Sequence, residues 1–180
     1  MAEILLTSEA FVKSAVGLRD NIAGAYILPA IREAQETRLR EVLGDALMER
    51  LKDMVSGGTV SSPENASYKA LLDRCQYFLA YAAATEVAGD IALKVGNLGV
   101  SRASDENLEP GSHDDVSALM ERYRGKADAA CLRLQRWLLD NREDFPELGE
   151  CGCGRLEANL RSAASCGIWL GGARGRRIRR

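Results

Sequence analysis

The stretch that decides the fold is SHDDVSALMERYRGKADAACLRLQRWLLDN, residues 112–141. It opens with the Ser112-to-Asp115 spacing of a capping box, with Asp in place of the preferred Glu, so we expect a helix to begin there. Apolar residues then recur at intervals of three and four, which places them on one face of an α-helix. The pattern stops near Asn141, ahead of Phe145-Pro146. The residues of this face are Val116, Leu119, Met120, Tyr123, Ala127, Ala130, Leu134, Trp137 and Leu138.

A second long helix is predicted upstream of this one. Ser62-Pro63-Glu64 has the pattern of an N-cap, a proline in the first helical position and an acid in the first turn. Periodic apolar residues carry the helix to about Lys94. From Tyr77 to Ala84 the chain is apolar on nearly every side, so this should be the central helix. The small side chains of Ala82–Ala84 would let a neighbouring helix approach closely.

Shorter helices are expected in the first third of the chain. Thr7 and Ser8 can cap a helix that has Glu9 in its first turn and ends at Gly17, after Val16.

A further helix is expected after the cap candidates Asp20 and Asn21. Pro29 lies inside its pattern and either belongs to the first turn of a shorter helix or kinks a longer one. Gly44 interrupts the pattern, and Asp45 restarts it to about Val55. The apolar stripe before the interruption is Ile27, Leu28, Ile31, Ala34, Gln35 and Leu39.

The segment between the two longest helices, residues 97–111, has no helical pattern. Its glycines and β-branched Val100 indicate a hairpin or an ordered loop, longer than connections in compact domains usually are. Five acids lie close together in and just after this segment, but their spacing does not match a calcium-binding EF-hand loop. They are Asp105, Glu106, Glu109, Asp114 and Asp115.

The chain changes character after Pro146. Residues 147–180 hold seven of the 17 glycines, and seven Arg against three Glu, in a chain whose net charge is −2. An acidic body with a basic end favours an anionic partner for the arm, although a solvated terminus explains the same charge. Arginine occupies five of the last seven positions: Arg174, Arg176, Arg177, Arg179 and Arg180.

These patterns predict an all-α protein of two parts. Residues 1–146 should form a bundle of four to five helices, with the hairpin or long loop between the two longest. Residues 147–180 should form an extended Gly/Arg-rich C-terminal arm. A length of 180 residues with 46% apolar residues is sufficient to bury a core.

The sequence offers little for catalysis, so we expect no enzyme, no cofactor and no metal. His113 is the only histidine, and neither glycine-rich nucleotide-binding motif is present. Cys151, Cys153 and Cys166 could supply three zinc thiolates, but C-x-C is not the usual zinc spacing and no histidine lies nearby. Their role stays open, whereas Cys75 and Cys131 lie on apolar helix faces as small core residues.

The cysteine count and the apolar runs also bear on location. An odd total of five cysteines at uneven spacing argues against a disulfide framework and fits a reducing compartment. No apolar run approaches the roughly 20 residues of a membrane span, and the N-terminal residues lack the features of a secretory signal. We therefore expect a protein that is made in a cytoplasm and does not bind membranes.

The order of features resembles one family, the small helical head–tail connector (adaptor) proteins of tailed bacteriophages. The chain looks closest to the branch found in phages of Bacteroides and in crAss-like phages. The stretches that carry the resemblance are LLTSEAF, residues 5–11; Ile27–Leu51; Gly99–Leu119; Arg133–Glu147; and GIWLGG, Gly167–Gly172. CGCG and the terminal GRRIRR have no counterpart that we can place in the family.

The resemblance implies a structural protein of the virion neck, made in the host cytoplasm. Such connectors form a ring, typically twelve-fold, beneath the portal at the head–tail interface. The ring extends the DNA channel and docks the tail. The implied partners are the portal protein, neighbouring copies of the chain, a tail or second neck-ring protein, and DNA that passes without sequence-specific contacts. A family of this kind has no active site.

In this family the termini and interhelical loops commonly make the contacts. The corresponding candidates here are the apolar Ile168, Trp169 and Leu170 together with the five terminal arginines, for binding a partner. Trp169 either anchors an interface or folds back over its own core. Loop residues Arg102, Asp105, Glu106 and Glu109 are candidates for the channel or for a neighbour contact. The alternative function is a small helical nucleic-acid-binding regulator that uses the Arg-rich tail on phosphates.

Overall fold

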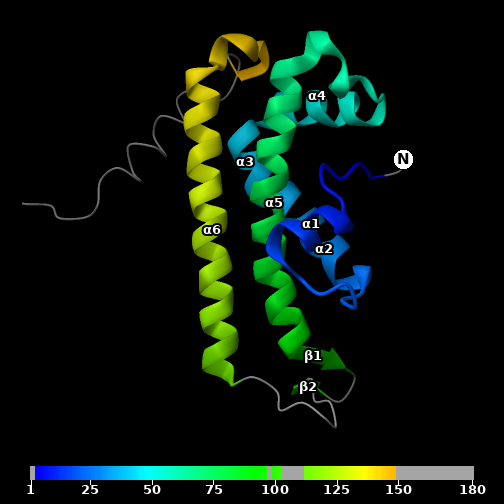
Figure 1. Cartoon of the computed structure of the whole chain (residues 1–180), viewed down its shortest axis with the longest axis vertical. Helices are drawn as coiled ribbons and strands as arrows, with labels where there is room; N and C mark the ends of the chain where they lie inside the picture. The colour runs from blue at the N-terminus through cyan, green and yellow to red at the C-terminus, as the bar shows by residue number, and fades with distance from the viewer. Residues whose placement is uncertain (1–2, 97–98, 103–111, 149–180) are drawn as a thin grey trace, which may run out of the picture.

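The computed structural model of the chain describes residues 3–96, 99–102 and 112–148, and within them the fold is all-α (Figure 1). The helices come in the order α1 (Glu9–Val16), α2 (Gly24–Ala34), the π-helix η1 (Gln35–Leu39), α3 (Arg40–Leu43), α4 (Asp45–Ser56), the 3₁₀ turns η2 (Thr59–Ser61) and η3 (Pro63–Asn65), α5 (Ala66–Ala92), α6 (His113–Asp140), and the 3₁₀ turns η4 (Arg142–Asp144) and η5 (Pro146–Leu148). Strands β1 (Leu93–Gly96) and β2 (Gly99–Arg102) lie between α5 and α6. If Gly24–Leu43 is taken as one continuous helical stretch, the described residues form the expected bundle of five helices.

The two longest helices, α5 and α6, run side by side in opposite directions (Figure 1). Helix α6 begins with the expected capping box, in which the Ser112 hydroxyl accepts the Asp115 N–H and the Asp115 carboxylate accepts the Ser112 N–H. Its apolar face packs on α5 through Tyr123, Ala127 and Leu134, all of which are buried. The sequence prediction for this pair is confirmed except at Leu119, which belongs to the predicted face but is 39% exposed.

On its other side, α5 carries the N-terminal helices. Val12 of α1 and Ile27 and Ile31 of α2 are fully buried, and they share a core cluster with Ala80 and Ala83 of α5. Because alanine side chains are small, two helices can lie close to α5 at this level while α6 occupies the opposite side. The prediction of α5 as the central helix is confirmed.

A second and larger core cluster fills the other end of the molecule. Helices α3 and α4 contribute Leu43, Leu47 and Leu51 to it, and α6 contributes Leu138. Phe145 and Leu148, which follow α6, are also buried in this cluster. The packed body therefore continues through Leu148, and the expected arm from residue 149 onward lies outside the described residues.

A buried glutamine attaches the N-terminal segment to this body. The side chain of Gln35 is fully buried in the π-helix η1. Its Oε1 accepts the Leu6 N–H at 2.8 Å, and its Nε2 donates to the Ile4 carbonyl at 3.0 Å. The Gln76 amide of α5 donates to the Leu6 carbonyl, also at 3.0 Å. Two side chains thus replace the backbone partners that an extended segment would otherwise find in a sheet.

The expected stripe of α2 is correct except at Leu28, which is 41% exposed. Residues spaced by four drift around an α-helix by about 40° per step. The wider turn of the π-helix η1 offsets this drift, so Gln35 and Leu39 stay in the core with Ile31. Leu28 directly follows the buried Ile27, so its side chain lies on a different side of the helix, about 100° away.

The start of α2 differs from the expectation. The helix begins at Gly24 rather than after Asp20-Asn21, and its N-cap residue, Ala23, provides no side-chain hydrogen bond. The Glu9 carboxylate of α1 lies against Gly24 so closely that a Cβ there would overlap it. A negative charge at a helix N-terminus is favourable, so the nearby Glu9 carboxylate can stabilise the start of α2 without a local side-chain cap. Pro29 lies inside the helix, beyond the first turn.

The ends of α5 also differ slightly from the prediction. The Ser62-Pro63 pair introduces the 3₁₀ turn η3, and regular α-helix starts at Ala66. At the other end the helix stops at Ala92, and Leu93 is already in an antiparallel hairpin, in which Val95 pairs with Val100. The hairpin thus begins before the expected segment and includes its residues 99–102, whereas residues 103–111 lie outside the described residues.

Gly44 provides a direct test of the break between α3 and α4. Its φ of 76° and ψ of 164° fall in a region that residues with a side chain rarely adopt. We expect Gly44→Ala to lower the free energy of unfolding by about 1–3 kcal/mol, measured by urea denaturation. The matched control is Gly125→Ala in α6, where nothing lies within 4 Å of an added Cβ. That change should stabilise the protein by up to about 1 kcal/mol, and equal effects at both sites would refute the argument.

Gln35 provides a second test. Gln35→Leu leaves the Leu6 N–H without its partner, and an unsatisfied buried donor costs about 1–3 kcal/mol. We expect that loss of stability and faster hydrogen exchange of the Leu6 amide. Gln76→Leu removes the donor to the Leu6 carbonyl only, so the Leu6 amide should remain protected in that control. Protection of this amide in both variants would contradict the attachment described above.

Candidate interaction surfaces

Most of the residues singled out from the sequence lie outside the described part of the chain. This holds for Asp105, Glu106 and Glu109 of the loop and for all of the arm candidates, Ile168, Trp169, Leu170, Arg174, Arg176, Arg177, Arg179 and Arg180. Arg102 ends strand β2, where it pairs in register with Leu93. The described surface instead presents three features that the sequence reading did not single out: a groove and two charged faces.

The groove lies between α5 and α6. Arg74 and Tyr77 from α5 and Ala130, Arg133 and Leu134 from α6 line a cavity of about 180 Å³. Tyr77 is 53% exposed although it lies in the most apolar part of α5. Its ring meets the edge of Phe11 from α1, with the ring centroids 5.3 Å apart. Apolar walls between two guanidinium groups are suited to a side chain that combines an apolar stem with a carboxylate.

Aromatic rings fix the cations around this groove. The Arg74 guanidinium lies over the Trp137 ring, 4.2 Å from its centroid, and the Lys126 ammonium lies 5.2 Å from the centroid of Tyr81. Trp137 is held in turn by an edge contact with the buried Phe145. Cations placed over aromatic faces in this way lose little additional freedom when a partner binds.

The second feature, which we call the basic face, is the exposed side of α6 that carries Arg122, Arg133 and Arg136, of which Arg133 also lines the groove. All three side chains are exposed, and none forms an ion pair with another described residue. Their neighbours differ in this respect, because Arg124 pairs with Glu121 and Asp128 pairs with Arg38. The basic face therefore carries uncompensated positive charge.

The third feature, the acidic face, is formed by Glu41, Asp45, Glu49 and Asp53. Asp45, Glu49 and Asp53 are spaced by four residues along α4, Glu41 lies on α3 ahead of the break at Gly44, and all four are exposed. Asp45 and Glu49 share Arg40, at 2.7 and 2.8 Å. Glu41 and Asp53 have no ion pair among the described residues. The carboxylates of this surface thus outnumber the cations.

Glu36 lies beneath the acidic face and connects it to the body. Lys52 donates a hydrogen bond to its Oε1 at 2.8 Å, and Arg40 contacts Oε2 at 2.7 Å. The hydrogen bond from Lys52 is the main reason that the pKa of Glu36 falls to about 2, against the opposing effect of burial. The carboxylates of Asp45, Glu49 and Glu36 raise the pKa of Arg40 above its ordinary value, and Asp45 contributes most.

The described residues offer no catalytic constellation. No group of three or more metal-binding side chains occurs among them. His113 is exposed at the first position of α6, beside the Ser117 hydroxyl. Burial raises the pKa of both described thiols, Cys75 and Cys131, which keeps them protonated and makes them poor nucleophiles. Cys151, Cys153 and Cys166 lie outside the described residues.

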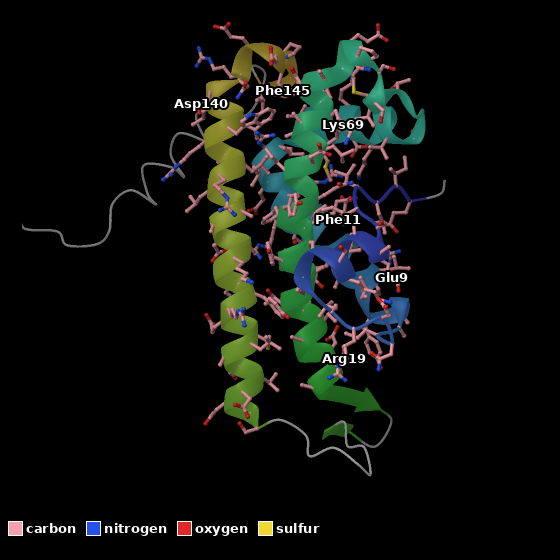
Figure 2. The ribbon with its side chains drawn as sticks, viewed as in Figure 1. Glu9, Phe11, Arg19, Lys69, Asp140 and Phe145 are labelled. Atoms are coloured by element: carbon pink, nitrogen blue, oxygen red, sulfur yellow. The ribbon has the colours of Figure 1, made fainter. Side chains whose placement is uncertain are left out.

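A wide recess of about 610 Å³ lies beside α1 and the turn that follows it. The amine of Lys13, which lines it, is already engaged by the Glu9 carboxylate at 2.6 Å and by the Asp20 carbonyl at 2.9 Å. Figure 2 shows Glu9 and Phe11 on this helix, with Arg19 in the turn that follows it. The charged groups of this recess serve the packing of α1 on α2. None of the described helices combines the length and the apolar character that crossing a membrane requires.

Comparison with known proteins places the chain in one family. Residues 39–157 match the family described as "Family of unknown function (DUF6712)". The match covers more than half of the chain, so the protein belongs to this family. No curated protein and no solved structure matches the chain. The matched residues include all of α5, the hairpin and α6.

Sequence reasoning could have found one of the two charged faces. The spacing of Glu41, Asp45, Glu49 and Asp53 is visible in the sequence as acids repeated every four residues. The groove could not be found in that way. A tyrosine in an apolar stretch, such as Tyr77, can lie either in the core or at the surface. Only the positions of α1 and α6 decide that its side chain is half exposed beside the groove.

Glu36 links the acidic face to stability in a way that pH can test. A carboxyl group whose pKa is lower in the folded state stabilises the fold above its ordinary pKa of 4.5, and this contribution is lost as the pH falls toward about 2. We expect the free energy of unfolding to fall less steeply between pH 4.5 and 2 for Glu36→Gln than for the wild type. Urea denaturation at a series of pH values measures this slope. Glu33→Gln, a nearby exposed carboxylate without an ion pair among the described residues, is the control and should keep the wild-type slope.

Proposed function

We propose that this protein is a structural subunit of the virion neck of a tailed phage, forming a ring under the portal at the head–tail interface. The ring would extend the DNA channel and dock the tail. The proposal begins from the ordered resemblance of five stretches of the chain to head–tail connector proteins. It is supported by the surface of the folded body.

The observation that carries the proposal is the one-sided packing of α6. This 28-residue helix packs on α5 along one face, and its outer face carries exposed Arg122, Arg133 and Arg136. Within the described residues no other long helix covers that side (Figure 1). A subunit of a closed ring needs two different free lateral surfaces, one for each neighbour. The outer face of α6 is suited to be one of them.

The dimensions of the helix pair also fit a ring wall. Helices of this length span about 40 Å at 1.5 Å per residue. The hairpin of β1 and β2 lies at one end of the pair, and α4 with η4 and η5 lies at the other (Figure 1). One end could face the portal while the other faces the tail or a second neck-ring protein.

The remaining elements of the proposal follow the family resemblance. The ring would contain copies of this chain, twelve in the typical case, in the neck of a virion assembled in the host cytoplasm. Ile168, Trp169, Leu170 and the terminal arginines would contact the portal or a neighbour. DNA would pass through the ring without sequence-specific contacts, with Arg102, Asp105, Glu106 and Glu109 near the channel or at a neighbour.

One observation favours the alternative, a nucleic-acid-binding regulator. The unpaired arginines of the basic face, together with the basic arm, could bind phosphates. Such binding would weaken steeply with salt. Gel-shift assays at low and physiological salt would detect it, and in that alternative the protein would be absent from mature particles.

The decisive measurement of the proposed function is the copy number in particles. Quantitative peptide mass spectrometry on purified virions that carry this gene should find the protein at a ratio to the portal protein near one to one. A matched particle preparation lacking the gene controls for host contamination. Absence from mature virions would remove the connector proposal.

A further inference from the structure

We propose that neighbouring copies of this chain associate through the two charged faces, with the acidic face of one copy docked on the basic face of the next. This inference rests on the proposed ring only for its biological setting. The contact itself is argued from the described surface.

The basic face is a continuous strip along α6. Arg133 lies eleven residues after Arg122, and Arg136 lies three residues after Arg133. These intervals are close to three turns and one turn of an α-helix, so the three arginines lie on the same side of α6. The exposed Ala129 lies between them, so the strip has no bulky obstruction at its centre. The strip extends for about 20 Å at 1.5 Å per residue. Lys126 borders it but is held over the ring of Tyr81.

The acidic face has the opposite sign. Asp45, Glu49 and Asp53 lie along one side of α4 over about 12 Å of helix, and Glu41 lies on α3, before the break at Gly44. The Asp45 side chain is 84% exposed and that of Glu49 is 56% exposed, so their carboxylates can reach a partner while retaining Arg40. Arginine and carboxylate groups form paired, charge-assisted hydrogen bonds, which makes each face a suitable ligand for the other.

The position of α4 separates most of the acidic face from the basic face within one copy. Helix α4, which carries Asp45, Glu49 and Asp53, lies on the other side of α5 from α6 (Figure 1). These three carboxylates can therefore meet a basic face only on another molecule. A contact between two different surfaces is head-to-tail, and head-to-tail contacts close into a ring when the rotation between subunits permits.

A second copy of the chain, as the binding partner, accounts for both charged faces, whereas nucleic acid accounts for the basic face alone. DNA would neutralise the basic face but would leave the acidic face without a partner and would be repelled by it. A second copy neutralises both. Because exposed ion pairs are individually weak and are screened by salt, we expect the association to be modest in solution and to weaken as ionic strength rises.

Charge reversal tests the contact. The first variant is Arg133→Glu with Arg136→Glu, and the second is Glu41→Lys with Asp53→Lys, which leaves the Arg40 and Glu36 network intact. Sedimentation velocity of the full chain, over a range of concentrations at low and high salt, measures self-association. Each variant should weaken association at least tenfold, and high salt should do the same to the wild type.

An equimolar mixture of the two variants gives the sharpest result. Each reversed face then meets a complementary face on the other variant, so association should return toward the wild-type level. The matched control is Arg19→Glu with Arg142→Glu, two exposed arginines outside both faces, and it should associate like the wild type. Circular dichroism of every variant confirms that the helices are retained.

Several outcomes would overturn the inference. They are a wild type that stays monomeric throughout, variants that associate as the wild type does, and a mixture that fails to recover. A loss of DNA binding by the first variant without any change in association would assign the basic face to nucleic acid instead. A protein present in virions but monomeric in solution would refute this interface and keep the connector proposal. If the protein associates in solution through these faces but is absent from virions, the interface is kept and the connector proposal is refuted.

Discussion

The fold depends on α5 burying several of its sides at once. Helix α6 packs on one side of it, α1 and α2 on another, and the core built with α3 and α4 on a third. Ala80, Ala82, Ala83 and Ala84 make this possible because a helix with small side chains can be approached closely from different directions. With larger residues there, the neighbouring helices could not share this level of the molecule.

This arrangement also accounts for the surface. Because α5 takes the central position, α4 and α6 are pushed to opposite sides, and each is left with one uncovered face. The charges on those faces are of opposite sign. The cations Arg40 and Lys52 pair with the acids Asp45 and Glu49 of α4, and aromatic rings hold Arg74 and Lys126 near the groove.

Much of the fold could be predicted from local sequence signals. The capping box at Ser112, the glycine break at Gly44 and the start of α1 after Ser8 are all confirmed. Errors occurred where a distant residue replaced a local signal. The start of α2 is the clearest case, because the acid at its N-terminus comes from Glu9 of another helix rather than from Asp20 or Asn21.

The candidate surfaces also divide into features that local sequence predicts and features that only the tertiary structure decides. The acidic spacing from Glu41 to Asp53 is visible in the sequence, as are the starts of α1 and α6, the break at Gly44 and the central role of α5, because each depends on residues within a few turns of one another. The groove around Tyr77, the burial of Gln35 and the opposition of the two charged faces belong to the tertiary structure alone. Each depends on which helices α5 brings together and which it keeps apart, and that is decided by packing between residues far apart in the chain.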